Sequence, residues 1–179
     1  MNRRIRNRTY GGERGRRKSF RLLLDKESQP SMQAFPVPMI EFIENNHVLS
    51  LATLDAEGLW SANCFYAFDA PAARLIILSS CDTRHGAAML GAGLISGTIS
   101  GQPKHLRDIR GIQFSALATR LEDLARYEAL GVYTRRHPLA KLKTTDIWSL
   151  ELQQLKFTDN HLLFGHKTHW NRAADEGQG

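Results

Sequence analysis

Residues 48 onward show short stretches in which apolar and polar positions alternate, and this two-residue period is typical of β-strands. The alternation predicts strands over 49–54, 60–68, 74–79, 94–100, 111–121 and 148–153. Turn residues at 55–58 and 69–71 connect the first three strands, and connections this short join antiparallel strands. A further tight hairpin is expected at 157–162, because Asp159 and Asn160 tolerate positive φ.

Apolar residues at helical spacing lie in other parts of the chain. They predict short helices over 37–46, 83–90, 122–136 and 138–143, with Gly91 closing the second and Pro138 opening the last. Short helices inserted between antiparallel strands favour a barrel over a parallel α/β sheet. The expected fold class is therefore α+β, with a six- or seven-stranded antiparallel β-barrel and short flanking helices.

Length and composition place the chain in a broad class. Its 179 residues fit one domain. Cys64 and Cys81 lack a C-x-x-C spacing, which suits a reducing compartment better than a disulfide framework. No apolar run approaches the roughly 20 residues of a membrane span, and the N-terminus lacks the apolar region of a secretory signal. We expect a cytoplasmic protein without a membrane partner.

Charge is concentrated at the N-terminus. Residues 1–31 hold ten basic and three acidic side chains, a net +7, whereas the whole chain carries +6. This polar, Gly-broken arm cannot bury enough apolar surface to order itself. It is either a basic tail that contacts nucleic acid or anionic surfaces, or an artefact of start-codon choice, because Met32 directly precedes the first patterned segment. The expected organisation is a disordered arm at 1–31, a barrel domain at 32–172 and a loose tail at 173–179.

The segment 78–85 is the first candidate for chemistry. A strand ends there in small polar residues, and a helix begins with Asp82 or Thr83 as its N-cap. Arg84 and His85 fall in the first helical turn, where cations oppose the helix dipole at a cost of roughly 0.3–1 kcal/mol unless an anion compensates. A phosphate site is one interpretation, and a solvated Arg84 paired with a nearby acid is the other. The candidate phosphate ligands are Ser79, Ser80, Thr83, Arg84 and His85.

Two further clusters carry weaker signals. Lys104, Arg107 and Arg110 lie in and after a polar connection, where a solvated loop competes with a ligand role. A third cluster contains His166, Lys167, His169 and Trp170. No carboxylate or cysteine lies at ligand spacing from its histidines, so no metal site is expected, while the indole ring has the right shape to stack on a flat ligand.

Several motifs together resemble a known family. They are Ala62-Asn63-x-Phe65-Tyr66-x-Phe68-Asp69, Thr83-Arg84-His85, Gly101-Gln102-Pro103-Lys104, Ile109-Arg110-Gly111-x-Gln113-Phe114 and Lys156-Phe157-Thr158-Asp159-Asn160. With the order of elements, they resemble the FMN-binding split barrel of the pyridoxamine 5′-phosphate oxidase superfamily, and most closely the YhbP-like bacterial proteins. The resemblance covers roughly 37–172 and excludes the arm.

The resemblance implies a cofactor, a site and an assembly. It implies that FMN binds with its phosphate at Thr83 and Arg84, with His85 in place of the usual lysine. The second strand lacks the superfamily's cations, which lowers the expected flavin affinity and argues against pyridoxamine phosphate oxidation itself. Asn63 and Tyr66 are expected near the ring, and the implied assembly is a homodimer with two pockets at the subunit interface. Lys104, Arg110 and Trp170 complete the candidate cofactor-binding set.

Three functions remain open at this point. The first is a flavin-dependent oxidoreductase of unknown substrate, in which the cofactor carries the reaction and no residue stands out as acid or base. The second is a non-catalytic binder or sensor of flavin, heme or another planar anion. The third is a nucleic-acid-associated protein that acts through residues 1–31 alone.

Overall fold

A computed structural model describes residues 34–142, 145–161 and 165–172. The predicted arm at 1–31 and tail at 173–179 lie outside the described residues. The elements are α1 (Val37–Asn45), β1 (Val48–Asp55), β2 (Gly58–Asp69), β3 (Arg74–Leu78), α2 (Arg84–Ala92), β4 (Leu94–Ser100), the 3-10 helix η1 (Leu106–Asp108), β5 (Arg110–Arg120), α3 (Asp123–Arg136), the 3-10 helix η2 (Pro138–Leu142), β6 (Ile147–Asp159) and β7 (Lys167–Asn171). Among the described residues, no helix is long and apolar enough to cross a membrane.

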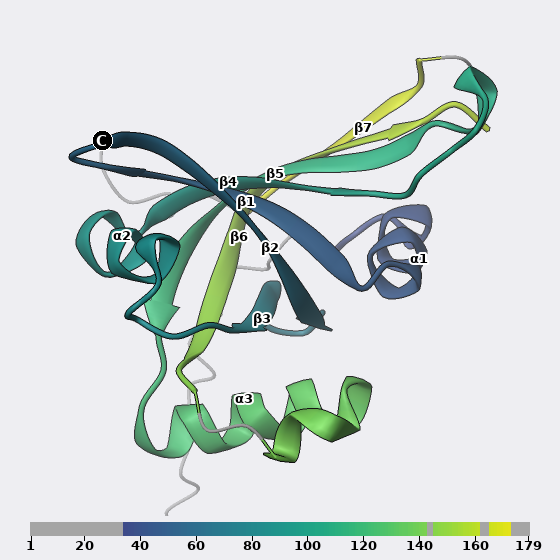
Figure 1. The fold of residues 1–179 in the computed structure, drawn as a ribbon. Coiled ribbons are helices and arrows are strands. Elements are labelled where there is room, and N and C mark those ends of the chain that lie inside the picture. The colour runs from purple at the N-terminus through teal and green to yellow at the C-terminus, as the bar shows by residue number, and fades with distance from the viewer. Residues whose placement is uncertain (1–33, 143–144, 162–164, 173–179) are drawn as a thin grey trace, which may run out of the picture.

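One antiparallel sheet contains all seven described strands, in the order β3-β2-β1-β4-β5-β6-β7. It closes on itself because β3 also pairs with the first part of β6, over Ile147–Glu151. The second part of β6, over Gln154–Thr158, pairs instead with β7. The ring therefore splits along β6, and the β5–β6–β7 extension points away from it (Figure 1). The predicted α+β antiparallel split barrel is confirmed.

The sequence patterns missed three details. β6 is one long strand, where alternation predicted a strand at 148–153 and a separate hairpin. A bulge next to Ser115 leaves Gln153 as an extra residue, so the apolar alternation changes phase within the strand. β7 was not predicted as a strand. α2 ends at Ala92 and is closed by Gly93 instead of Gly91, because Gly93 has the positive φ of 67° that stops the helix.

The main core fills the inside of the ring. Inward positions alternate along the strands, as at Leu49 and Leu51 of β1. Met39, Phe42 and Ile43 of α1 join this core from one end, and Met89 of α2 joins it near the other. α3 instead packs on the outer side, where Ala129 and Tyr133 form a second cluster with Ala67, Ile76 and Ile147. Figure 1 shows α1 and α2 at opposite ends and α3 below the ring.

Candidate functional site

Hydrogen bonds among its own polar groups stabilise the loop between β3 and α2. Thr83 is the N-cap of α2: its Oγ1 accepts from the Gly86 N–H at 3.1 Å and donates to the Ser80 carbonyl at 2.8 Å. A Cβ added at Gly86 would lie 2.2 Å from that carbonyl, so glycine is required for this close packing. Ser80 Oγ in turn donates to Asp82 at 3.1 Å. The predicted helix start at Thr83 is confirmed.

His85 faces into this loop. Its Nε2 lies 2.6 Å from Ser79 Oγ and 3.3 Å from Thr83 Oγ1. The Ser79 carbonyl accepts from Trp148 Nε1 at 2.9 Å, which anchors the loop to β6. Burial lowers the pKa of His85 from its ordinary value of 6.5, so the imidazole is neutral at physiological pH. The histidine therefore stabilises the loop and adds no fixed positive charge to the helix start.

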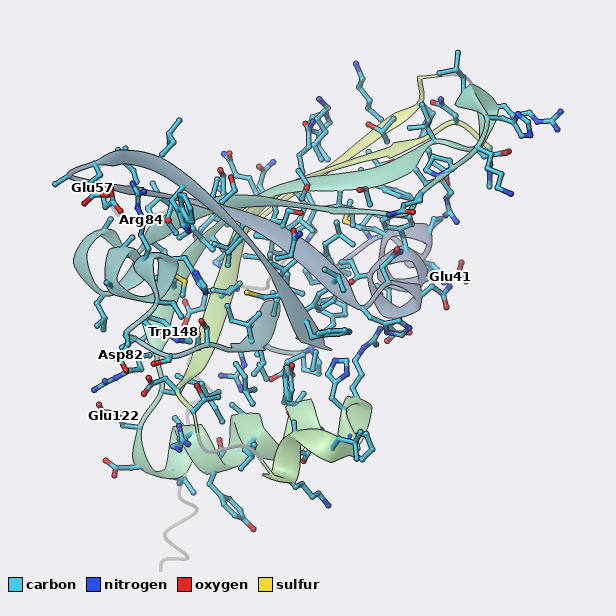
Figure 2. The ribbon with its side chains drawn as sticks, viewed as in Figure 1. Glu41, Glu57, Asp82, Arg84, Glu122 and Trp148 are labelled. Atoms are coloured by element: carbon cyan, nitrogen blue, oxygen red, sulfur yellow. The ribbon has the colours of Figure 1, made fainter. Side chains whose placement is uncertain are left out.

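Arg84 turns away from the loop toward the β1–β2 hairpin. Its Nε donates to Asp55 Oδ2 at 2.7 Å and its Nη2 to Asp55 Oδ1 at 3.0 Å. Glu57 lies 3.4 Å from Nη1, and the guanidinium carbon is 4.6 Å from the Trp60 ring centroid. The hydrogen bonds from Arg84 hold the pKa of Asp55 below its ordinary value. Figure 2 shows Arg84 and Glu57 side by side near the end of this hairpin.

A hollow of about 430 Å³ lies between the hairpin and α2. Its walls are the small residues of one α2 face and the hairpin tip, namely Leu54, Asp55, Ala56, Arg84, Ala87, Ala88, Gly91 and Ala92. Among these described lining residues, Arg84 is the only cation, and its side chain is 31% exposed. The volume lies within the range of small-molecule sites. This hollow therefore has space for a flat ligand next to one partly exposed guanidinium.

The other predicted site residues lie elsewhere. Tyr66 is fully buried and donates its hydroxyl to the Ile43 carbonyl at 2.6 Å. Trp170 is also fully buried and stacks on Phe35, 4.2 Å between ring centroids, where a flat ligand was expected. Asn63 lies exposed on β2 and accepts from Ser50 Oγ at 2.6 Å. The structure therefore does not bring the side chains of Tyr66, Trp170 and Asn63 to the start of α2.

The two predicted cations of the β4–β5 connection are also remote. Figure 1 shows this connection at the end of the sheet away from α2. Lys104 is exposed there, and Arg110 binds Asp159 at 3.0 Å while lying over Phe42 and Phe157. The structure thus brings together Ser79, Ser80, Thr83 and His85 from the predicted set, whereas the Arg84 side chain points to the hairpin.

No sequence pattern predicts the partners of Arg84. Asp55 and Glu57 were assigned to a turn, and Trp60 to a strand, with no role at the site. Their contact with Arg84 spans more than 20 residues of sequence, so no local pattern reports it. The alternative interpretation, an arginine paired with a nearby acid, describes the observed side chain.

Comparison with solved structures defines the class of fold. A heme-binding protein from Mycobacterium smegmatis superposes with a TM-score of 0.64 at 17% identity, over 78% of this chain and 60% of that one. HutZ, the heme storage protein from Vibrio cholerae, gives 0.56 at 19% identity, over 69% and 94%. An FAD-binding protein from Mesorhizobium loti gives 0.56 at 12% identity, over 70% and 95%. These likenesses show that the chain has the split-barrel fold.

Sequence relatives identify the family within that class. A UPF0306 protein from Haemophilus ducreyi is 43% identical over 146 residues, which cover 80% of this chain and all of the relative. The UPF0306 protein YhbP from Salmonella schwarzengrund is 38% identical over 133 residues, covering 74% and 90%. No family model matches the chain. The chain belongs to the UPF0306 family, and the predicted resemblance to YhbP is confirmed.

Proposed function

We propose that this protein binds a planar, anion-bearing cofactor, foremost FMN, in the hollow between the β1–β2 hairpin and α2. The observation that carries the proposal is Arg84, which lines this hollow at the positive end of a helix and remains partly exposed. Split-barrel proteins whose names describe FAD or heme binding support the same class of ligand. Heme is therefore the second candidate ligand.

The residues present fit the cofactor in part. The first backbone N–H groups of an α-helix have no acceptor within the helix and suit a phosphate. Arg84 binds the anion in place of the Asp55 carboxylate that it contacts now. The hydroxyls of Ser79 and Thr83 and the imidazole of His85 already bond to one another, so they support the loop behind the phosphate. Binding at this site therefore depends on Arg84 much more than on His85.

A bound flavin would supply hydride transfer, and the chain would hold and orient it. Trp60, 44% exposed beside Arg84, offers a flat apolar surface at the site. Cys64 does not suggest thiol catalysis, since burial raises its pKa to about 11. We therefore place any oxidoreductase activity with the cofactor, on a substrate that enters the same hollow in the cytoplasm.

Fluorescence titration of FMN tests the proposal directly. Arg84→Ala removes a charge-assisted contact, so affinity should fall about 10- to 150-fold relative to wild type. Arg107→Ala, which removes an 82% exposed arginine from the β4–β5 connection, is the matched control and should leave affinity unchanged. A parallel titration with hemin, followed by absorbance, distinguishes the two cofactors. Equal affinity of Arg84→Ala and wild type for both ligands would exclude this site.

A further inference from the structure

Cationic side chains gather at the outer end of the β5–β6–β7 extension. Three segments meet there, namely the β4–β5 connection with η1, the end of β6 and the start of β7 (Figure 1). The Asn160 side chain donates to the Leu106 carbonyl at 2.8 Å, and the Asp159 N–H donates to the His166 carbonyl at 3.0 Å. Six exposed basic or imidazole side chains of these segments form what we call the basic tip: Lys104, His105, Arg107, His161, His166 and Lys167.

Acidic side chains do not balance the basic tip. One carboxylate, Asp108, occurs among the described residues at 101–109, 160–161 and 165–167. It lies 3.8 Å from Arg107 Nε and 3.7 Å from His161 Nε2, so two side chains share it. The neighbouring Asp159 is buried and already holds an arginine. Figure 2 shows Glu41 on α1, apart from the tip. The tip therefore presents net positive charge to solvent.

The arm at 1–31 joins the domain close to the basic tip. The described chain begins at Ala34, and Phe35 stacks on Trp170 of β7 with ring centroids 4.2 Å apart. Trp170 follows Lys167 by three residues on the same strand, a distance of about 10 Å at the rise of a β-strand. The +7 of the arm and the charge of the tip therefore belong to the same end of the molecule, where both can contact one polyanion.

The composition of the arm is typical of segments that bind single-stranded nucleic acid. Residues 1–21 contain eight arginines, one lysine and a single acidic residue. Arginine suits a phosphate backbone because its fork binds two oxygens at once, and its flat guanidinium also stacks on bases. Tyr10 and Phe20 lie among these arginines. Aromatic rings between cations provide stacking surfaces for unpaired bases.

A single strand fits this surface better than a duplex or an anionic membrane. Imidazole and aromatic rings stack on the faces of bases, and a duplex keeps those faces covered. An arm that lies on a membrane needs one continuous apolar face opposite its cations. The large apolar or aromatic side chains of residues 1–21 are too few and too far apart for such a face: Met1, Ile5, Tyr10 and Phe20.

We propose that the basic tip and the arm together bind a single strand of nucleic acid through its phosphates. The surface shares no residue with the hollow beside α2, so this assignment is independent of the proposed cofactor. Lys104, Arg107 and Lys167 contact phosphates, and the imidazoles of the tip and the rings of the arm stack on bases. Binding of this kind depends on backbone charge and has little sequence preference.

Fluorescence anisotropy of labelled oligonucleotides tests this assignment on the full chain. The probes are single-stranded RNA, single-stranded DNA and a DNA duplex, each about 20 nucleotides long, which exceeds the site size of one small domain. Lys104→Gln combined with Arg107→Gln should lower the affinity for the single strands at least about 10-fold at about 0.1 M salt. The slope of log affinity against log salt should also fall by about 1.4, since each phosphate contact of a single strand contributes about 0.7.

The matched control removes one arginine and one lysine elsewhere. Arg135→Gln combined with Lys141→Gln changes exposed residues of α3 and η2 and lowers the net charge by the same amount. This variant should bind the single strands like wild type, and so should Arg84→Ala at the hollow. Circular dichroism of each variant confirms that it is folded. Both single strands should bind more tightly than the duplex, and their relative affinities identify RNA or DNA as the preferred strand.

The arm has a test of its own. Replacing Arg14, Arg16 and Arg17 with Gln in the full chain should also weaken binding of the single strands, with a further fall in the salt slope. Unchanged affinity would remove the arm from the surface and overturn the joint assignment.

Other results would also overturn the proposal. Equal losses in the tip variant and its control would mean that net charge alone attracts the strand. Wild-type affinity in the tip variant would remove the tip from the surface. Tighter binding of the duplex, or no binding of wild type to any oligonucleotide at micromolar concentration, would exclude a single-strand surface. Binding to phosphatidylglycerol vesicles without binding to oligonucleotides would assign the charge to a membrane instead.

Discussion

The two ends of the barrel hold the same arrangement in different surroundings. At each end an arginine binds an aspartate and lies over an aromatic ring: Arg84 with Asp55 near α2, and Arg110 with Asp159 near α1. Asp159 is 4% exposed and also accepts from the His161 N–H at 2.9 Å, whereas Asp55 is 22% exposed at a hairpin tip. The Arg110–Asp159 pair is built into the packing, and the Arg84–Asp55 pair lines an open hollow.

This difference explains why Arg84 belongs to a candidate site and Arg110 does not. A buried carboxylate with two donors keeps its arginine in place, because breaking the pair leaves an uncompensated charge. Asp55 is more exposed than Asp159, so solvent screens its attraction for Arg84 more strongly. We therefore expect Arg84 to exchange its carboxylate partner more readily than Arg110.

The largest expected effect is on stability at the α1 end. Asp159→Ala should lower the free energy of unfolding by about 2–4 kcal/mol, because it removes two hydrogen bonds at a buried acceptor and leaves Arg110 unpaired. Asp55→Ala, the same substitution at the more exposed pair, should cost less. Urea unfolding of both variants measures the difference. Equal losses would mean that the two ends are not distinct in the way described.

Tyr66 provides a smaller test of the same distinction. Tyr66→Phe removes the buried hydrogen bond to the Ile43 carbonyl, so unfolding free energy should fall by about 1–2 kcal/mol. Affinity for FMN should stay unchanged, because this hydroxyl ties β2 to α1 away from the hollow. A large loss of flavin affinity with unchanged stability would return Tyr66 to the binding site.

The smallest expected effect is a pH dependence from His85. Burial lowers its pKa below 6.5, so the unfolded chain takes up this proton more readily than the folded chain. Its contribution to stability is complete above about pH 6.5 and declines as the pH falls toward the lowered folded value. His85→Asn should therefore show a flatter decline between pH 7 and 5 in thermal melts. His169→Asn, at an exposed histidine of β7, should behave like wild type.

Local signals predicted much of this structure. The Thr83 cap depends on residues three apart, and both its helix and the alternating strands follow from short patterns. The bulge that leaves Gln153 unpaired is set by the partner strand, so alternation along β6 alone misplaced its end. Alternation also marked the second strand without saying which aromatic side chains face inward. The resemblance placed Tyr66 near a ligand, whereas its side chain lies in the core.

The sequence predicted only the part of the candidate site that consists of neighbouring residues. Ser79, Ser80, Thr83 and His85 come together because they are neighbours in sequence. The hairpin carboxylates that bind Arg84, and the hollow beside them, depend on a contact between β1 and α2 that no short pattern encodes. Residues expected at the site from other strands were placed by resemblance, and the fold positions them elsewhere.

A crystal structure of the protein with FMN is the most direct test of the account. We predict the phosphate within about 3 Å of the Arg84 guanidinium, with the flavin ring in the hollow beside α2 and the Asp55 carboxylate displaced. A flavin bound elsewhere while Arg84 and Asp55 remain paired would contradict the account.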